Sequence, residues 1–308
     1  MYKYVVKRLL FLIPSLLVVA FIVFSIMELT PGTPGRAILG PQATQEQVDR
    51  LNEDIGFNRP FLVRFFSYVG SALTGDFGIS YRTRRPVFDE ILARFPTTLN
   101  LALLGVVGAA MIGIPLGVLS AVKQYSIVDA VSTFSALLLA AIPVFWFGMM
   151  LVLFFSLELG WLPSSGIGTW RHYILPAVTL ILPSAAAILR MTRTTMLETI
   201  RQDYIRTAKA KGASPQRVIW FHALKNALLP VITNLGMTFG FLLGGAVLTE
   251  AVFALPGLGT FILSSIRTMD IAIVMGSILF LAFLFCIILL VVDLIYAFLD
   301  PRIKAQYK

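Results

Sequence analysis

Six long apolar runs decide what this chain can fold into. Each comes close to the roughly 20 apolar residues that a helix needs to cross the hydrocarbon core of a bilayer. They lie at about residues 9–29, 99–121, 130–155, 174–189, 228–248 and 271–299. The fourth run is short and contains Pro176 and Pro183, which disfavour a helix interior. The sequence therefore predicts an all-α membrane protein with six transmembrane helices.

The composition supports an integral membrane protein. Of the 308 residues, 57% are hydrophobic and 13% are charged, whereas soluble domains carry roughly 25% charged residues. The first apolar run is too long for a cleaved signal peptide and is followed by no small-x-small cleavage site, so we expect it to remain as an anchor. Cys286 is the single cysteine, which excludes an intrachain disulfide.

Basic residues predict the orientation of the spans. If the N-terminus is cytoplasmic, the inner segments hold 15 Lys and Arg residues, and eight of these lie between Arg190 and Lys225. The short outer segments hold only Arg171 and Arg267, while the loop at residues 30–98 is too long for the rule to apply. Both termini are therefore predicted to be cytoplasmic. The net charge of +9 reflects this topology, so no nucleic-acid partner is expected.

Residues 30–98 have the composition of a small soluble unit. In "ATQEQVDRLNEDIG", Thr44 is the expected N-cap of a helix, Gln47 its capping-box partner and Gly56 its stop. The stretch "RPFLVRFFSYV" predicts a second, amphipathic helix suited to the membrane surface. We expect an extracytoplasmic α-helical insert, either a lid over the helix bundle or a docking surface for an external partner.

The chain is accordingly divided into two parts. Residues 1–98 form the N-terminal anchor helix and the insert, and residues 99–308 form a five-helix core. The core contains a basic cytoplasmic loop at about residues 190–227.

Small residues recur every four positions on one face of two predicted helices. In lipid, such stripes let helix backbones approach closely where no hydrophobic force drives association. They are Gly105, Ala109, Gly113 and Gly117 in the second helix and Gly236, Gly240 and Gly244 in the fifth. We expect them to pack helices within one chain; the alternative is a moving seam between two subunits.

The basic loop contains a rigid bend. In "RTAKAKGASPQRV", Gly212 is expected to end one helix in the left-handed conformation, and Ser214 to cap the next helix with Pro215 at its first position. Ala208 and Ala210 keep the first arm slim enough to enter a groove. Because orientation in the membrane needs charge but no bend, this pattern favours a docking element that passes force to the fifth helix.

The same segment resembles a known loop. "DYIRTAKAKGAS", followed by "HALKNALLP", resembles the cytoplasmic coupling loop of binding-protein-dependent ABC transporter permeases, in particular the dipeptide, oligopeptide and nickel branch. The general motif has Glu-Ala-Ala before the glycine, where this chain has Arg206, Thr207 and Ala208. Further stretches that resemble the branch are "GPQATQEQVDRL", "GDFGISYRTRRPV", "RFPTTLNLAL", "EAVFALPGLG" and "VDLIYAFLDPRI". The stretch "RTMDIAI" departs from the Arg-Asp-Tyr-Pro-like sequence of the branch.

The resemblance implies a permease subunit of an ABC importer in a bacterial or archaeal plasma membrane. Such a subunit pairs with a sister permease, expected here as a heterodimer, with two ATPase subunits and with an extracytoplasmic substrate-binding protein. The ATPase-coupling residues that it implies are Arg206, Thr207, Ala208, Lys209, Ala210, Lys211, Gly212, Ala213 and Ser214. No catalytic residue, metal or cofactor is expected in this chain, and ATP with Mg²⁺ is expected on the partners. The sequence contains no Gly-Lys dipeptide and hence no phosphate-binding G-x-x-x-x-G-K loop, which agrees.

Peptides are the cargo that the resemblance favours, with nickel chelates and glutathione as alternatives. An ion-coupled secondary transporter is less favoured, because such proteins need ionisable residues near the bilayer centre. Glu28, Glu158 and Glu250 all fall at predicted outer helix ends. An intramembrane protease or metalloenzyme is disfavoured because His172 and His222 are predicted on opposite sides of the membrane. A passive channel would have no use for the rigid bend.

Overall fold

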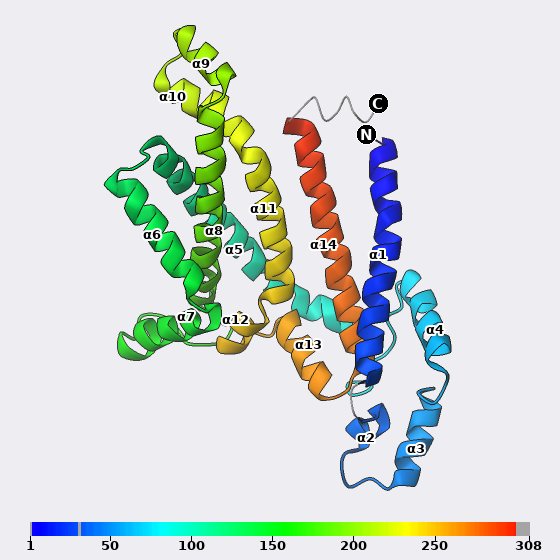
Figure 1. Cartoon of the computed structure of the whole chain (residues 1–308). Helices are drawn as coiled ribbons and strands as arrows, with labels where there is room; N and C mark the ends of the chain where they lie inside the picture. The colour runs from blue at the N-terminus through cyan, green and yellow to red at the C-terminus, as the bar shows by residue number, and fades with distance from the viewer. Residues whose placement is uncertain (1, 30–31, 300–308) are drawn as a thin grey trace. The chain divides into compact units, whose positions relative to one another are not determined.

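The computed structural model describes residues 2–29 and 32–299, and this part of the chain consists of helices and connecting loops (Figure 1). The chain forms two compact units. We call Tyr2–Thr98 with Pro256–Cys286 the N-terminal unit, and Leu99–Leu255 with the residues from Ile287 on the core unit. The N-terminal unit thus includes a segment that the sequence division assigns to the five-helix core.

Five helices among the described residues are long and apolar enough to cross a membrane. They are α1 (Tyr2–Leu29), α5 (Val87–Val122), α8 (Ile174–Ile200), α11 (Leu224–Gly245) and α14 (Ile271–Leu299). A bent helix pair adds a sixth span if the pair is counted as one. The predicted all-α fold of up to six spans is therefore confirmed. The basic tail with Arg302, Lys304 and Lys308 lies outside the described residues.

The third predicted span is broken. It consists of α6 (Ile127–Ala141) and of α7 (Val144–Leu151) with the π-helical η1 (Val152–Glu158), and the two halves are bent by 100°. Between them Ile142 is extended, with φ −82° and ψ 127°, and Pro143 follows. Proline disfavours the helical conformation in the residue before it and has no N–H to donate. The prediction of one continuous helix over 130–155 is therefore wrong, and Pro143 is the signal that marks the break.

Two helices extend well beyond the apolar runs that predict them. Helix α5 begins at Val87 instead of near residue 99, and α8 ends at Ile200 instead of near residue 189. The first turn of α5 carries Asp89 and Glu90, where negative charge is favourable at a helix N-terminus. Hydropathy locates the apolar middle of a helix, whereas polar residues continue both helices past it. A loop containing the short η2 (Trp170–Tyr173) leads into α8, and α12 (Val247–Val252) follows α11.

The insert in the N-terminal unit contains the helices α2 (Pro34–Leu39), α3 (Gln45–Asp54) and α4 (Phe61–Leu73). The capping box of α3 is confirmed, since Thr44 Oγ1 accepts from Gln47 N at 3.4 Å and Gln47 Oε1 accepts from Thr44 N at 3.0 Å. Gly56 follows the helix with φ +72°, as its role as a stop requires.

Helix α4 packs against α1 through aromatic rings. Phe24 on α1 meets Phe61 at 5.2 Å and Phe65 at 5.7 Å between ring centroids, in edge-to-face geometry. Arg64 on α4 donates to Glu28 on α1 at 2.6 Å. The predicted amphipathic helix therefore exists, and its apolar face is partly covered by the anchor helix.

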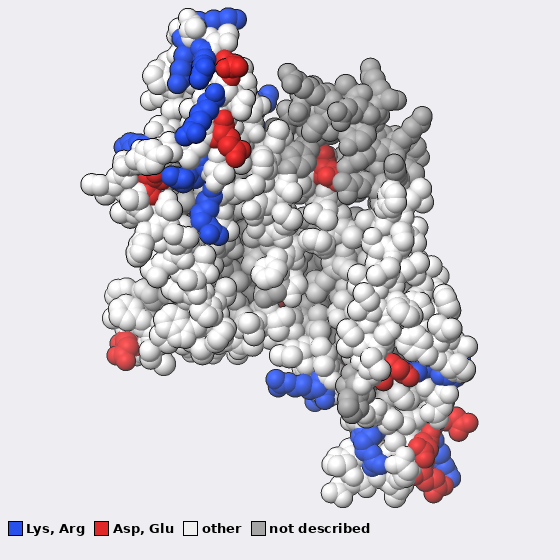
Figure 2. Space-filling model, viewed as in Figure 1, with Lys and Arg blue, Asp and Glu red and all other residues white. Residues whose placement is uncertain are grey.

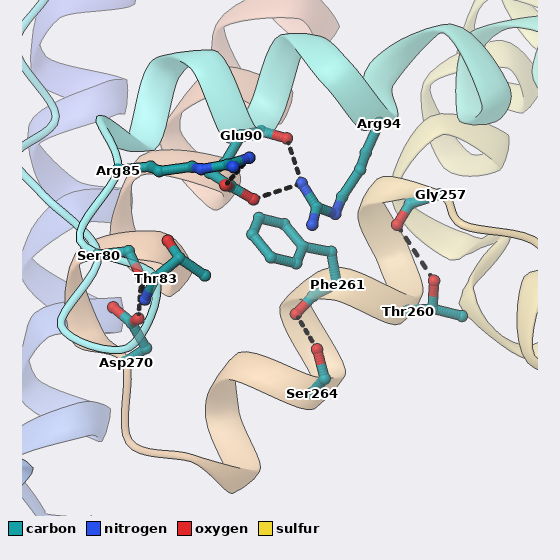
Figure 3. Close-up of polar contacts among 10 residues, drawn as sticks. All are labelled: Ser80, Thr83, Arg85, Glu90, Arg94, Gly257, Thr260, Phe261, Ser264 and Asp270. Carbon is teal, nitrogen blue, oxygen red and sulfur yellow. Dashed lines mark hydrogen bonds and ion pairs between the residues drawn. The ribbon is translucent and has the colours of Figure 1, made fainter. Parts of the chain in front are cut away.

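Polar contacts link the start of α5 to α13 (Leu258–Arg267), and the loop before α5 to the residue before α14 (Figure 3). Arg94 donates to the buried Glu90 carboxylate at 2.6 Å, and its guanidinium lies 3.8 Å from the centroid of the Phe261 ring. Asp270, which is 1% exposed, accepts from Ser80 Oγ at 2.6 Å. Buried polar groups of this kind persist because they are hydrogen-bonded. The segment "RTMDIAI" thus contains a structural carboxylate, Asp270.

Candidate functional site

A helix-turn-helix bend joins α8 to α11 in the core unit (Figure 1). Its first arm is α9 (Asp203–Ala210), and its second is α10 (Pro215–Arg217), which continues through the π-helical η3 (Val218–Ala223) into α11. We call the segment Asp203–Arg217 the elbow. The nine residues that the resemblance assigns to coupling, residues 206–214, all lie within it.

The turn of the elbow is a Schellman motif, as the sequence pattern predicts. Gly212 has φ +80° and donates its N–H to the Lys209 carbonyl at 2.9 Å. Ala213 donates to the Ala208 carbonyl at 3.2 Å. These two bonds satisfy carbonyls that the end of α9 would otherwise leave free, and they fix the angle of the chain after Gly212.

The second arm begins as predicted and continues differently. Ser214 caps it by accepting from Arg217 N at 3.4 Å, and Pro215 occupies the first helical position. From Val218 to Ala223 the helix is π-helical, so its side chains do not follow the spacing of a regular α-helix. Val218 is buried, whereas Phe221 is 73% exposed. A π-helical turn is uncommon and often lies at functional sites, and no residue pattern in the sequence signalled this one.

Both arms are anchored on an apolar cluster at the ends of three long helices. Ile205 from α9 and Val218 from η3 are buried in it together with Met196 of α8. The remaining buried members come from α5, the end of η3 and α11 and are Val118, Ala121, Ala223, Leu224 and Ala227. Tyr204 Oη also accepts from Asn226 Nδ2 of α11 at 3.0 Å. Because these side chains pack together, a displacement of the elbow would be transmitted to α8 and α11.

The outer surface of the elbow is exposed and basic. Of residues 206–214, only Ala208 and Ala213 are half-buried, and the rest are exposed. Figure 2 shows Lys and Arg side chains gathered over α8, α9 and α10, with fewer acidic ones among them. Arg206 lies 3.7 Å from Asp203 in an exposed pair, which contributes little to stability. Neither Lys209 nor Lys211 takes part in an ion pair within residues 2–29 and 32–299.

A groove of about 450 Å³ runs beside the elbow. Its walls are mainly apolar and include Val122 of α5, Ile200 of α8 and Pro215 of the elbow. Arg201 and Lys209 add positive charge to it. The elbow thus offers a convex basic arm next to a concave apolar surface.

The small residues of α5 face α8 and α11 within the chain. A Cβ on Gly113 would lie 2.7 Å from the Ala185 carbonyl oxygen of α8, and one on Gly117 would lie 2.8 Å from the Leu189 carbonyl oxygen. A Cβ on Gly105 would lie 2.7 Å from Leu242 Cδ1 of α11. At Gly113 and Gly117 only a hydrogen fits between the backbones, whereas the neighbour of Gly105 is the end of a flexible side chain.

The small residues of α11 are less uniform. A Cβ on Gly236 would clash with Val292 of α14, and Gly240 is half-buried. A Cβ on Gly244 would meet nothing within 4 Å. The close packing within this chain therefore includes Gly236 and excludes Gly244, although both share the same sequence stripe.

Comparison with known proteins matches the whole chain to one kind of protein. Residues 113–305 match the family described as the binding-protein-dependent transport system inner membrane component, and residues 1–102 match the N-terminal part of such membrane components. The chain is 41% identical over 304 residues to the glutathione transport system permease protein GsiC of Escherichia coli strain K12, which covers 99% of each chain. The GsiC protein of Shigella flexneri serotype 5b matches with the same identity and coverage.

Two solved structures share the fold. A chain of the MetNI methionine ABC transporter, in an inward-facing conformation, matches with a TM-score of 0.54 and 23% identity over 68% of this chain and 96% of that chain. A chain of an amino acid ABC transporter with histidines matches with a TM-score of 0.54 and 14% identity, over 67% of this chain and 92% of that chain.

Proposed function

Since the chain belongs to the inner membrane components of binding-protein-dependent transport systems, we propose that it conducts short peptides of the glutathione class through an ABC importer. Its role as a permease subunit in the inner membrane follows from the family itself. The observation that carries the cargo is the 41% identity to a glutathione transport permease over 99% of both chains. Glutathione is one of the two alternatives that the sequence left open beside peptides, and as a tripeptide it is compatible with a peptide importer.

The partners that we propose are a sister permease, two ATPase subunits and an extracytoplasmic binding protein. The two permeases form the translocation pathway, and ATP with Mg²⁺ binds to the ATPases. Support comes from the family description, which names the dependence on a binding protein. The lack of a Gly-Lys dipeptide in the sequence supports the location of ATP on other chains. We propose that both termini are cytoplasmic, because 15 Lys and Arg residues then lie in the inner segments and only Arg171 and Arg267 in the short outer ones.

The elbow is the part that we propose to dock on an ATPase subunit. Its first arm is short and slim, with Ala208 and Ala210 next to Lys209 and Lys211, for which the described residues provide no ion-pair partner. Its base is anchored on the cluster around Ile205 and Val218. Closure and reopening of the ATPases would therefore move the elbow as a stiff piece and tilt α8 and α11 with it. This motion would open the pathway alternately to the two sides.

Docking predicts the effect of a charge on the slim arm. Ala208→Glu should weaken the co-purification of the ATPase subunits about tenfold or more, because a bulky carboxylate would be buried against the partner without a counter-charge. Glu198→Gln changes an exposed residue in the last turn of α8 and serves as a control that alters charge nearby but leaves the arm unchanged. Undiminished co-purification of the Ala208→Glu complex would remove the docking proposal.

The cargo is tested by uptake. Cells that carry the binding protein, both permeases and the ATPases receive labelled glutathione, a labelled dipeptide or a labelled nickel chelate, and an Ala208→Glu strain measures the background. We expect uptake of glutathione above this background and competition by unlabelled glutathione. Uptake of nickel chelate or of the dipeptide alone would replace the proposed cargo by the one transported.

A further inference from the structure

A buried ion pair joins α6 to α8, and the proposed docking of the elbow makes no use of it. Arg193 of α8 donates from Nε to Asp129 Oδ1 at 2.6 Å and from Nη2 to Asp129 Oδ2 at 2.9 Å. The Asp129 side chain is 6% exposed and that of Arg193 is 25% exposed. Two parallel bonds between a guanidinium and a carboxylate fix both the distance and the relative orientation of the helices that carry them.

The Asp129 carboxylate also accepts hydrogen bonds from two further segments. Ser120 of α5 donates its hydroxyl to Oδ1, and Tyr125 in the α5–α6 turn donates its backbone N–H to Oδ2 at 3.0 Å. Asp129 itself lies in the first turn of α6, which Ser126 caps. One side chain therefore holds together α5, the turn after it, α6 and α8.

The turn that Asp129 holds is strained and exposed. Tyr125 has φ +64°, a left-handed conformation that is unfavourable for a residue with a Cβ. Its side chain is 87% exposed, and that of the neighbouring Ile127 is 82% exposed. The Tyr125 N–H bond to Asp129 offsets the strain, so the shape of the turn depends on Asp129.

Arg193 lies about two helical turns before Ile200, the last residue of α8 ahead of the elbow. Met196, between them, belongs to the cluster that anchors the elbow. Further along, α6 and α8 meet through apolar side chains, Ala136 against Ala186 and Leu189. Apolar contacts of this kind permit sliding in lipid, whereas among the described residues Asp129–Arg193 is the polar link that fixes the register of the two helices.

We propose that Asp129 and Arg193 are positioning residues for coupled transport: they make α6 and the α5–α6 turn follow α8 when the elbow moves. This inference rests on the proposed docking of the elbow. Without the pair, α8 would still be displaced by the ATPases, but α6 would lag behind, and ATP would be hydrolysed with less cargo moved. The pair therefore acts on the amount of cargo transported per ATP.

The test uses the complete transporter, with binding protein, in lipid vesicles. The double variant Asp129→Asn/Arg193→Gln keeps hydrogen-bonding groups of similar size and removes both charges, so no unpaired charge is left buried. We expect it to assemble and to hydrolyse ATP at the wild-type basal rate, while cargo transported per ATP falls at least about fivefold. Arg193→Lys, which keeps the charge and loses the paired geometry, should fall in between.

Arg190 provides the matched control. It lies one turn earlier on α8, is exposed, and takes part in no ion pair within the described part of the chain. Arg190→Gln should leave cargo per ATP unchanged. The inference would be overturned if the double variant or Arg193→Lys kept the wild-type ratio of cargo transported to ATP hydrolysed. It would also be overturned if transport and ATP hydrolysis fell in step with the amount of assembled complex. The docking of the elbow is tested by a different measurement. If the Ala208→Glu variant co-purifies with as much ATPase as the wild type, docking has failed independently of the result for Asp129 and Arg193.

Discussion

The double variant Gly113→Ala/Gly117→Ala is expected to lose most of its folded, membrane-inserted protein, whereas Gly244→Ala keeps it. A Cβ on Gly113 would lie 2.7 Å from the Ala185 carbonyl oxygen, and one on Gly117 would lie 2.6 Å from Thr192 Cβ. Real Cβ atoms do not approach other heavy atoms so closely, so α5 and α8 must move apart along their contact. The loss follows because van der Waals contact is the main force between helices in lipid.

The size of the effect follows from two opposing terms. Alanine is favoured over glycine in a helix interior by about 1 kcal/mol. Overpacking costs about 1–3 kcal/mol per site, and a backbone carbonyl cannot rotate away as a side chain can. Contact with a backbone carbonyl puts each of the two sites in the upper part of this range, at about 2–3 kcal/mol. After about 1 kcal/mol per site is subtracted for the alanine preference, we expect the double variant to be destabilised by roughly 2–4 kcal/mol in the free energy of unfolding. At Gly244 nothing lies within 4 Å of the added methyl group, so only the higher helix propensity of alanine changes the stability. The Gly244→Ala variant should therefore be as stable as the wild type or more so.

Cys286 allows the thermal stability of these variants to be measured without adding a site for a label. It is the only cysteine in the sequence and is half-buried, so its reaction with a maleimide dye during heating reports unfolding in detergent. The double variant should react at a lower temperature than the wild type, and Gly244→Ala should not. Equal melting of the double variant and the wild type would show that the α5–α8 contact is not close-packed.

The comparison of Gly113 with Gly244 also shows what the sequence could predict. A period of four identifies the face on which small residues lie, because the helix repeat is fixed. Which partner helix covers that face depends on tertiary packing, and Gly113 meets α8 while Gly244 meets nothing. The stripe of the second helix therefore predicted its close contacts, and the stripe of the fifth predicted them only in part.

Local chemistry predicted the turns well. Gly212, Ser214 and Thr44 act as stop and caps because the atoms involved are within a few residues in sequence. The bend at Pro143 is also determined locally, but hydropathy averages over a whole span and does not detect it. The ion pair of Asp129 with Arg193 joins residues far apart in sequence, and no pattern along one chain signals such a pair.

Gly212→Val is expected to reduce transport and the stimulation of ATP hydrolysis by about tenfold, while insertion and melting stay at wild-type values. Gly212 has φ +80°, and a Cβ added there would meet nothing within 4 Å. The cost of the substitution is therefore purely conformational. A residue with a Cβ pays about 1–2 kcal/mol in the left-handed region, and a β-branched one pays at least that. Each 1.4 kcal/mol lowers the population of the native turn about tenfold.

The global fold should tolerate this change because the elbow is anchored elsewhere. Ile205 and Val218 stay buried at its base whether or not the Schellman bonds form, so the reaction of Cys286 on heating should not shift. What changes is the angle between the two arms. A loose elbow can still bind an ATPase subunit, but it bends when pulled and passes less of the motion to α8 and α11.

A series at this one position separates stiffness from docking. Asn accepts the left-handed conformation better than other residues with a Cβ, so Gly212→Asn is expected to transport within about twofold of the wild type. Gly212→Ala should be intermediate, and Gly212→Val lowest, with ATPase co-purification similar in all three. Transport in the order glycine, asparagine, alanine, valine follows the cost of positive φ and would tie coupling to the backbone conformation at Gly212. If Val and Asn behaved alike, side-chain size or charge at the contact would explain the loss, and the elbow would be a docking site without the function of a lever.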